Sequence, residues 1–257
     1  GETAGVPGTS DVSILEFRNV SYTYPNGAAA LRNVSLAFNA GEYIVLTGPN
    51  GAGKSALARS ANGILRPQQG QVRYHGRDAF ADLRALRRAV AVMFQSADHQ
   101  FVASTVGTDV AFGPENYRYA PDEVAARVDR AIDAMGIEHL RDTDPLLLSG
   151  GEKRRVALAG LLALDPEIII LDEPFASLDY MGVRSVLTAL RSLYERGVTI
   201  VAITHAVEKV AAEATRMVLM YEGRAVGDGA PEEIVRLGRD YGLPPEERSL
   251  EMLTWLR

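Results

Sequence analysis

A glycine-rich loop that ends in a lysine and a serine is the clearest chemical feature of the sequence. Its glycines would let backbone N–H groups converge on phosphate oxygens without obstruction by Cβ atoms, and a helix that starts there adds favourable partial charge. In this pattern the lysine can reach the β- and γ-phosphates of a nucleotide, and the serine hydroxyl can ligate Mg²⁺. A glycine-rich turn with a solvated lysine is the alternative. The residues of the loop are Gly48, Pro49, Asn50, Gly51, Ala52, Gly53, Lys54 and Ser55.

Two carboxylates follow an apolar run further along the chain. Asp172 and Glu173 come directly after Ile168–Leu171. A carboxylate at the C-terminal end of a buried strand lies where open α/β sheets bind their ligands. Asp172 suits a Mg²⁺ shell, and Glu173 suits positioning or polarising an attacking water. Without the phosphate loop, two solvated acids at a strand end would explain the pair equally well.

A second candidate anion site is formed by Ser149, Gly150 and Gly151. Ser149 has the character of an N-cap, and the run that follows it, Glu152–Leu164, is strongly helical. A helix N-terminus of this kind binds anions. Because the chain has a single nucleotide loop, the second site either serves a nucleotide held by another molecule or is only a helix cap.

Alternating strands and helices must position these residues. Continuous apolar strands are buried on both faces, which is typical of a parallel sheet covered by helices. A helix is expected after the loop, at 53–62, and another at Tyr180–Arg196, which stops at Gly197. The fold class is therefore α/β. The expected core strands are Tyr43–Thr47, Val90–Phe94, Ile168–Leu171 and Val198–Ile203.

Other segments depart from this alternation. Short alternating strands in Ile14–Phe38 and Gly70–Gly76 predict an antiparallel patch beside the main sheet. Residues 95–160 contain no convincing strand, and apolar residues from Val124 to Met135 recur at helical spacing until Gly136, so this part is expected to be a helical insertion. Residues 1–13 are expected to be a flexible segment outside the fold.

Composition narrows the functional classes. The 257 residues are 47% hydrophobic and 23% charged, which is ordinary for a globular protein. The net charge of −6 argues against general nucleic-acid binding, so no nucleic-acid partner is expected. No cysteine is present, which excludes disulfides and cysteine nucleophiles. No apolar stretch approaches the ~18 residues of a membrane span, and no secretory signal opens the chain.

The order of the motifs resembles that of the nucleotide-binding subunits of ATP-binding cassette (ABC) transporters, from about Ile14 to Ile234. The resemblance implies an α/β P-loop NTPase (RecA-like) core with an antiparallel β subdomain and a helical subdomain at about 96–160. It places the ATPase domain at 14–230 and a short helical C-terminal extension at 231–257. The matching motifs are Gly48–Ser55, Gln95, Leu148–Glu152, Ile168–Glu173, Ser177–Asp179 and His205.

The same resemblance implies an ATPase that binds ATP and Mg²⁺ and works as a dimer. Two copies would pair head to tail, each ATP lying between one chain's phosphate loop and the other's Ser149–Gly151. Tyr24 resembles the aromatic residue that stacks on adenine, although a core tyrosine on a strand face would look alike. Gln95 resembles the loop glutamine that ligates Mg²⁺ and senses the membrane partner. His205 resembles the histidine that contacts the γ-phosphate, and Asp179 the residue that communicates across the dimer.

A narrower resemblance is carried by Phe94–Phe101 and Asp109–Gly113. These segments are similar to those of the ATPases of energy-coupling-factor importers, which take up vitamins or ions such as cobalt and nickel. The resemblance implies a transmembrane coupling protein and a separate substrate-binding membrane subunit as partners. It places the chain peripherally on the cytoplasmic face of the cell membrane. The tail, with Leu250, Leu253 and Leu256 at helical spacing, would help two ATPases associate or pack as a helix on its own domain.

Three departures from the family pattern leave the catalytic groups in place. Ala56 follows Ser55 where threonine is common, which removes a hydroxyl that usually meets the α-phosphate and predicts somewhat weaker nucleotide binding. Glu152 stands where glutamine is commoner, and Tyr180 where proline is usual. A homodimer with two competent sites is therefore expected, with a paralogous partner as the alternative. The alternative hypotheses are an ATPase of an ordinary ABC transporter, a non-transport ABC ATPase and a non-hydrolysing scaffold. The transported substrate is left open between a transition metal, which is preferred, and a vitamin.

Overall fold

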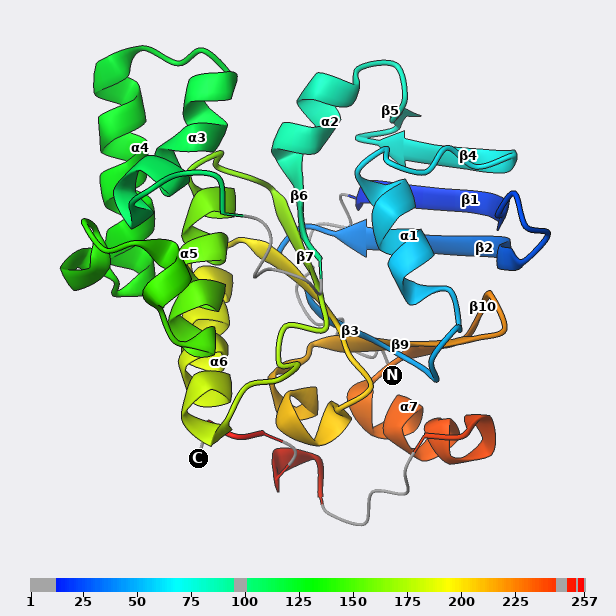
Figure 1. The fold of residues 1–257 in the computed structure, drawn as a ribbon. Coiled ribbons are helices and arrows are strands. Elements are labelled where there is room, and N and C mark those ends of the chain that lie inside the picture. The colour runs from blue at the N-terminus through cyan, green and yellow to red at the C-terminus, as the bar shows by residue number, and fades with distance from the viewer. Residues whose placement is uncertain (1–12, 95–100, 244–248, 253, 257) are drawn as a thin grey trace, which may run out of the picture.

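A six-stranded sheet lies at the centre of the computed structural model, which describes residues 13–94, 101–243, 249–252 and 254–256. The strand order is β10-β9-β3-β8-β7-β6; neighbours from β9 to β6 are parallel, and β10 is antiparallel to β9 (Figure 1). All four strands expected from apolar runs are present. The strands are β3 (Tyr43–Thr47), β6 (Val90–Met93), β7 (Ile168–Asp172), β8 (Thr199–Ile203), β9 (Arg216–Tyr221) and β10 (Arg224–Gly229).

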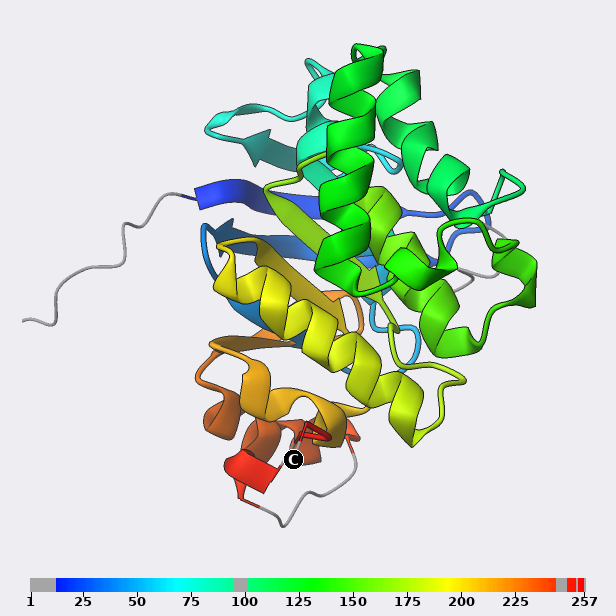
Figure 2. The ribbon, with the colours of Figure 1, turned by 90° about the vertical axis from the view of Figure 1, so that its left-hand side faces the viewer.

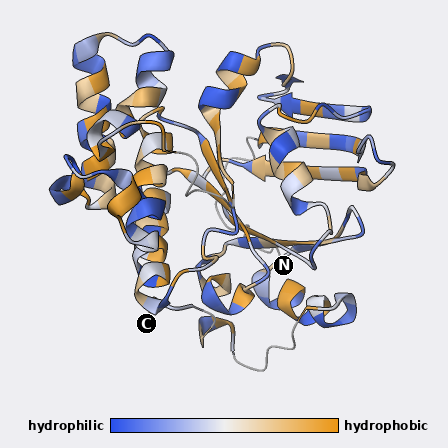
Figure 3. Ribbon diagram, in the orientation of Figure 1, coloured by the Kyte–Doolittle hydropathy of each residue, from blue (hydrophilic) through white to orange (hydrophobic). Residues whose placement is uncertain are grey.

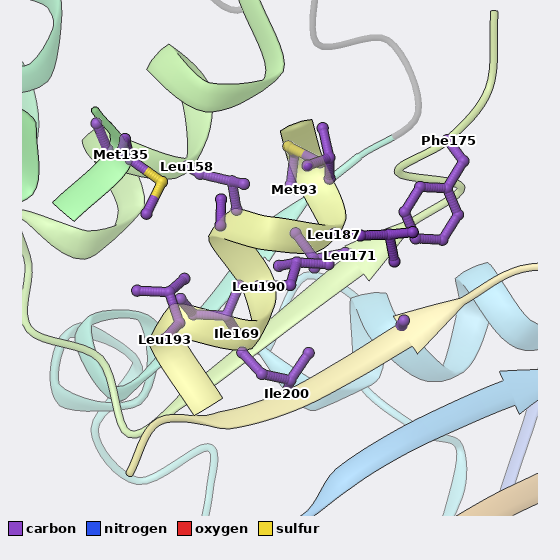
Figure 4. Packing of buried hydrophobic residues seen from close by; sticks show 14 of the residues in the cluster. Met93, Met135, Leu158, Ile169, Leu171, Phe175, Leu187, Leu190, Leu193 and Ile200 are labelled. Carbon is purple, nitrogen blue, oxygen red and sulfur yellow. The ribbon is translucent and has the colours of Figure 1, made fainter. Parts of the chain in front are cut away.

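The central strands are buried on both faces, as their continuous apolar sequences predict. In β7, Ile168 and Ile170 belong to one hydrophobic cluster, while Ile169 and Leu171 belong to another on the opposite face. Figure 4 shows the second cluster, where Leu187 and its neighbours on α6 (Tyr180–Glu195) lie over Ile169 and Leu171. Hydropathy colouring shows these strands as largely apolar (Figure 3). The sheet is thereby fixed in the core, and the loops at its strand ends are free to carry chemistry.

An antiparallel sheet covers part of the other face, together with helices α1 and α2 (Figure 1). This four-stranded sheet has the order β2-β1-β4-β5, and the antiparallel patch expected at Ile14–Phe38 and Gly70–Gly76 lies within it. Phe17 and Phe38 meet edge to face at its core. Its strands are β1 (Ser13–Thr23), β2 (Ala29–Asn39), β4 (Gln69–Tyr74) and β5 (Arg77–Asp78), and the helices are α1 (Lys54–Ala61) and α2 (Leu83–Ala89).

The insertion is helical over its described residues. It contains α3 (Val106–Asn116), α4 (Pro121–Met135) and α5 (Gly150–Leu162), which group together beside α6 in both ribbon views (Figures 1 and 2). The apolar residues of α4 that recur at helical spacing are the buried ones, and Gly136 ends the helix in the left-handed conformation at φ 60°. The periodicity therefore predicted both the helix and its buried face.

Two parts of the chain differ from expectation. Strands β9 and β10 were not predicted; β10 contains Gly227 and Gly229 and has little apolar periodicity, so only its pairing with β9 reveals it. The tail is less helical than the leucine spacing suggested: after α7 (Pro231–Leu237) the described residues hold only 3₁₀ turns, the last at Leu250–Met252. A segment this short gains too few hydrogen bonds to offset helix nucleation. No helix among the described residues has the length and apolar character needed to cross a bilayer.

Candidate functional site

The phosphate loop connects β3 to α1 and has the backbone shape that its glycines allow. Gly48 has φ 140°, and a Cβ there would lie 2.0 Å from the carbonyl oxygen of Met220. Gly53 has φ 100°, and its Cβ would lie 2.3 Å from the oxygen of Ala30. Gly53 is also the N-cap of α1, and no side chain caps that helix. Its first N–H groups therefore point from an open helix N-terminus, the arrangement that binds phosphate.

Lys54 is folded back against the loop that precedes it. Its Nζ donates to the carbonyl oxygen of Gly48 at 2.7 Å and to that of Pro49 at 3.0 Å. The side chain is buried, and desolvation lowers the pKa of its ammonium from the ordinary value. The ammonium is thus held by neutral carbonyls, and no carboxylate of the described residues forms an ion pair with it, which suits it to meet an anion.

Asp172 ends β7 and lies next to the start of α1. Only 5% of it is exposed, and burial raises the pKa of its carboxyl even though a hydrogen bond with the Ser55 side chain opposes the shift. Carboxylate and hydroxyl oxygens are the ligands that Mg²⁺ prefers. A buried carboxyl whose charge is only partly compensated is suited to a divalent cation, so the donor set of Asp172 and Ser55 fits the metal.

Glu173 and His205 form a hydrogen-bonded pair at the ends of β7 and β8. Oε1 of Glu173 lies 2.8 Å from Nδ1 of His205 and accepts from the His205 backbone N–H at 3.2 Å. The hydroxyl of Thr204 donates to Oε2 at 3.1 Å. The Glu173 side chain is 13% exposed and the His205 side chain 60% exposed, so the carboxylate is fixed while the imidazole reaches outward. Glu173 has φ 51°, a left-handed conformation that is costly for a residue with a Cβ.

These groups line one cavity of about 440 Å³. It brings together most of the candidate residues: Tyr24 from the end of β1, the loop from Asn50 to Ala56, and the carboxylates with His205. Gly48 and Pro49 begin the loop and contact Lys54 instead of lining the cavity. Three alanines were missed, because small apolar side chains carry no chemical signal in a sequence. The lining residues are Tyr24, Ala28, Ala29, Ala30, Asn50, Gly51, Ala52, Gly53, Lys54, Ser55, Ala56, Asp172, Glu173 and His205.

Ser149 and the glycines after it do not line this cavity. They begin α5, where Ser149 and Glu152 form a capping box: the Glu152 carboxylate accepts from the Ser149 backbone N–H at 2.8 Å and from its hydroxyl at 2.7 Å. These hydrogen bonds lower the pKa of Glu152. Ser149 is exposed, so the N-terminus of α5 can be reached by a ligand from outside the chain.

The start of α6 packs directly against the start of α5. Asp179 caps α6 by accepting from the Gly182 backbone N–H at 2.7 Å. A Cβ on Gly151 would lie 3.0 Å from the Cα of Gly182, and one on Gly150 would lie 3.0 Å from Cδ2 of Leu178. The glycines therefore permit a close approach that places Asp179 beside the start of α5, the candidate second anion site. Gln95, the remaining candidate, lies outside the described residues.

Comparison with known proteins identifies relatives over most of the chain. The ABC transporter family matches residues 31–176. An energy-coupling factor transporter ATP-binding protein, EcfA, from Methanosarcina acetivorans is 44% identical over 86% of this chain and 81% of its own length. A cobalt import ATP-binding protein, CbiO, from Rhodobacter capsulatus is 44% identical over 86% of this chain and 80% of its own. The structure of cbiO1 from Clostridium perfringens, part of the ABC transporter complex cbiONQ, superposes with a TM-score of 0.81 at 36% identity, covering 87% of this chain and 91% of that one.

Proposed function

From the premise that the chain belongs to the ABC transporter family, and within it to the ATP-binding proteins of energy-coupling-factor transporters, we propose that it powers import of a transition-metal ion through separate membrane subunits. The chain binds and hydrolyses ATP as members of this family do. One observation carries the proposal: a single cavity joins an open helix N-terminus, a buried lysine and the Glu173–His205 pair. Such a cavity can bind a triphosphate and activate a water molecule beside its γ-phosphate.

The loop and α1 would bind the phosphates. The uncapped N–H groups of α1 supply donors, and Lys54 would turn from the carbonyls of Gly48 and Pro49 to the β- and γ-phosphates. Tyr24 also lines the cavity, where its ring would stack on adenine. Lys54→Ala should weaken ATP binding, and unchanged affinity by isothermal titration calorimetry would contradict this assignment.

Glu173 would position the attacking water and accept its proton. The hydrogen bonds from Thr204 and the His205 backbone hold the carboxylate in one orientation, so the carboxylate does not have to reorient before it accepts the proton. The exposed imidazole of His205, oriented by the Nδ1 contact with Glu173, would contact the γ-phosphate with its other nitrogen. Glu173 reaches this position with a left-handed backbone conformation, which is strained for a residue with a Cβ.

Ser55 and Asp172 would hold Mg²⁺, and Gln95 is proposed as a further ligand from the family pattern. When bound, the ion would neutralise charge on the β- and γ-phosphates. Asp172 would gain a partner for the charge that burial disfavours in the nucleotide-free chain. Asp172 would therefore hold the metal ion at the C-terminal end of β7, next to Glu173.

A second copy of the chain would complete each site. Ser149, Gly150 and Gly151 lie at an accessible helix start that would bind an anion, yet the chain's own nucleotide cavity does not include them. A head-to-tail pair would bring them to the nucleotide of the partner, as the resemblance implies, and Asp179 beside them would then contact the other subunit. No catalytic residue is replaced, so two identical chains could form two active sites.

The membrane partners are proposed to be a transmembrane coupling protein and a substrate-binding subunit. A similar structure is part of the ABC transporter complex cbiONQ, which supports membrane partners for this chain. A related protein is named for cobalt import, which favours a transition-metal cargo over a vitamin. The chain would then attach peripherally to the cytoplasmic face of the cell membrane.

Affinity purification of the tagged chain from detergent-solubilised membranes tests this proposal. We expect mass spectrometry to identify one coupling protein and one small membrane subunit, with no second ATPase. A paralogous ATPase in the complex would replace the homodimer by a heterodimer. A pair of fused transmembrane domains would indicate an ordinary ABC transporter, and only soluble or ribosomal partners would refute a role in transport.

A further inference from the structure

The end of the chain contacts two segments that lead to the nucleotide site. The indole of Trp255 lies against the ring of Tyr180, with centroids 5.4 Å apart and planes inclined by 41°. The ammonium of Lys209 lies 4.8 Å from the centroid of the Trp255 ring. Stacked rings and cations over an indole face attract each other. Trp255 thus bridges α6 and the 3₁₀ turn Val207–Lys209 that follows β8.

Hydrogen bonds hold this segment in place. The backbone N–H of Trp255 donates to the carbonyl oxygen of Lys209 at 3.2 Å. The hydroxyl of Thr254 donates to Oε1 of Glu213 at 2.8 Å, and Arg191 of α6 pairs with the other oxygen of that carboxylate at 2.7 Å. The Glu213 side chain is only 7% exposed, so these are shielded contacts. The segment is docked in one place on its own domain.

Both contact partners of Trp255 adjoin residues of the proposed site. Tyr180 directly follows Asp179, the cap of α6 beside the anion site that would face a second chain. Lys209 follows His205 by one turn, and His205 is bonded to Glu173 in the cavity. Tyr180 also stands where the family pattern usually has proline, a residue that could not form this aromatic pair.

We propose that Trp255 is a positioning residue that couples the segment after Asp179 to the segment after His205. This inference rests on the proposed ATPase site. A docked indole restricts how far the start of α6 can move relative to the turn after β8. Occupation of the nucleotide cavity, which engages His205, is thereby transmitted to the surface that meets the second subunit, and loss of the indole uncouples them.

The chain contains a single tryptophan, so its fluorescence reports this contact alone. The probe is Mg²⁺-ATP added to the full-length Glu173→Gln chain, in which hydrolysis is blocked and ATP remains bound. We expect the emission of Trp255 to change and to saturate at the ATP concentration at which calorimetry shows saturation of binding. Tyr180→Leu in the same background should abolish most of the emission change and leave the calorimetric affinity unaltered.

Constant emission during calorimetrically measured binding would overturn the inference while leaving the ATPase assignment intact. Failure to bind ATP at all would instead refute the proposed function, on which the inference depends. An emission change of equal size in Tyr180→Leu would also overturn it, because the coupling would then not pass through the aromatic pair.

Kinetics of the full chain in its membrane complex give a second test. Trp255→Ala should lower kcat about threefold to tenfold with little change in KM, because it removes ring and cation contacts but no group of the cavity. Trp255→Phe, which keeps an aromatic ring, should restore most of the rate. Met252→Ala is the matched control, since Met252 lies in the same tail and its side chain is largely exposed. Wild-type kcat in Trp255→Ala, or an equal loss in Met252→Ala, would overturn the proposal.

Discussion

Replacing Glu173 by glutamine separates the chemistry of the site from its architecture. The substitution keeps the length and shape of the side chain and leaves an oxygen at which His205 can donate. The amide group that replaces the other oxygen faces Thr204, whose hydroxyl can rotate to accept a hydrogen bond instead of donating one. What the variant loses is the negative charge and the ability to take a proton.

The expected change in stability is small because two effects oppose each other. Hydrogen bonds to a charged group contribute about 1.5–3 kcal/mol and neutral ones about 0.5–1.5, so the exchange weakens the contacts with Thr204 and His205. Removal of the charge also relieves repulsion with buried Asp172, whose pKa is raised in part by Glu173. We expect a net change within about 1 kcal/mol, or about 2–4 °C in Tm for a domain of this size. Loss of the general base should lower kcat by about 10²–10⁴.

Phosphate release by the purified transporter and calorimetric Tm of the isolated chain measure the two quantities. Glu222→Gln is the matched control, because Glu222 is an exposed glutamate with a similar left-handed backbone, φ 46°, and does not line the cavity. The control should retain both rate and stability. A Glu173→Gln chain that hydrolyses ATP within about threefold of the wild-type rate would refute the assignment of the base.

Three further predictions follow from single contacts. Asp172→Asn should raise the Tm of the nucleotide-free chain at neutral pH, because burial raises the pKa of the carboxyl and its ionised form therefore disfavours folding. This destabilisation of the wild-type chain disappears as the pH falls through the folded-state pKa. A lower Tm of the variant at neutral pH would contradict the prediction. Gly48→Ala should destabilise the chain by about 3 kcal/mol or more in urea titrations, because its Cβ would overlap the Met220 carbonyl; an unchanged midpoint would show that the loop can shift. Glu152→Gln should preserve the capping box with Ser149. Because it removes a negative charge near the partner's phosphates, it should lower the ATP concentration needed for dimerisation about twofold to tenfold, as measured by light scattering. Weaker dimerisation would contradict this placement of Glu152.

Local patterns predicted the elements that carry the site. Continuous apolar runs such as Ile168–Leu171 identified strands buried on both faces, and glycines at fixed positions identified the phosphate loop, because each pattern is a direct consequence of local geometry. The structure places Asp172, Glu173 and His205 in one cavity because parallel strands end at the same edge of the sheet. Their roles in ATP hydrolysis remain predictions that the experiments above test.

Features that depend on contacts between distant segments could not be predicted. The close approach of Gly151 to Gly182 is reflected in the sequence only by a glycine in each helix, and a glycine alone does not identify its contact partner. Ala28–Ala30 line the cavity through position alone. Trp255 docks against Tyr180 through a contact spanning 75 positions of sequence, which no local periodicity encodes.

Mixing two inactive variants tests most directly the claim that each ATP site is shared by two chains. Lys54→Ala disables the phosphate loop, whereas Ser149→Asp keeps a good helix cap but opposes a negative charge to the phosphates. Each homodimer should be inactive, while a mixed dimer has one site with an intact loop and an intact Ser149 face. We predict that mixing equal amounts, with exchange of subunits, restores about a quarter of the wild-type ATPase rate, since half of the dimers are mixed and each has one complete site. A mixture as inactive as its components, or a Ser149→Asp chain with wild-type activity alone, would contradict the shared site.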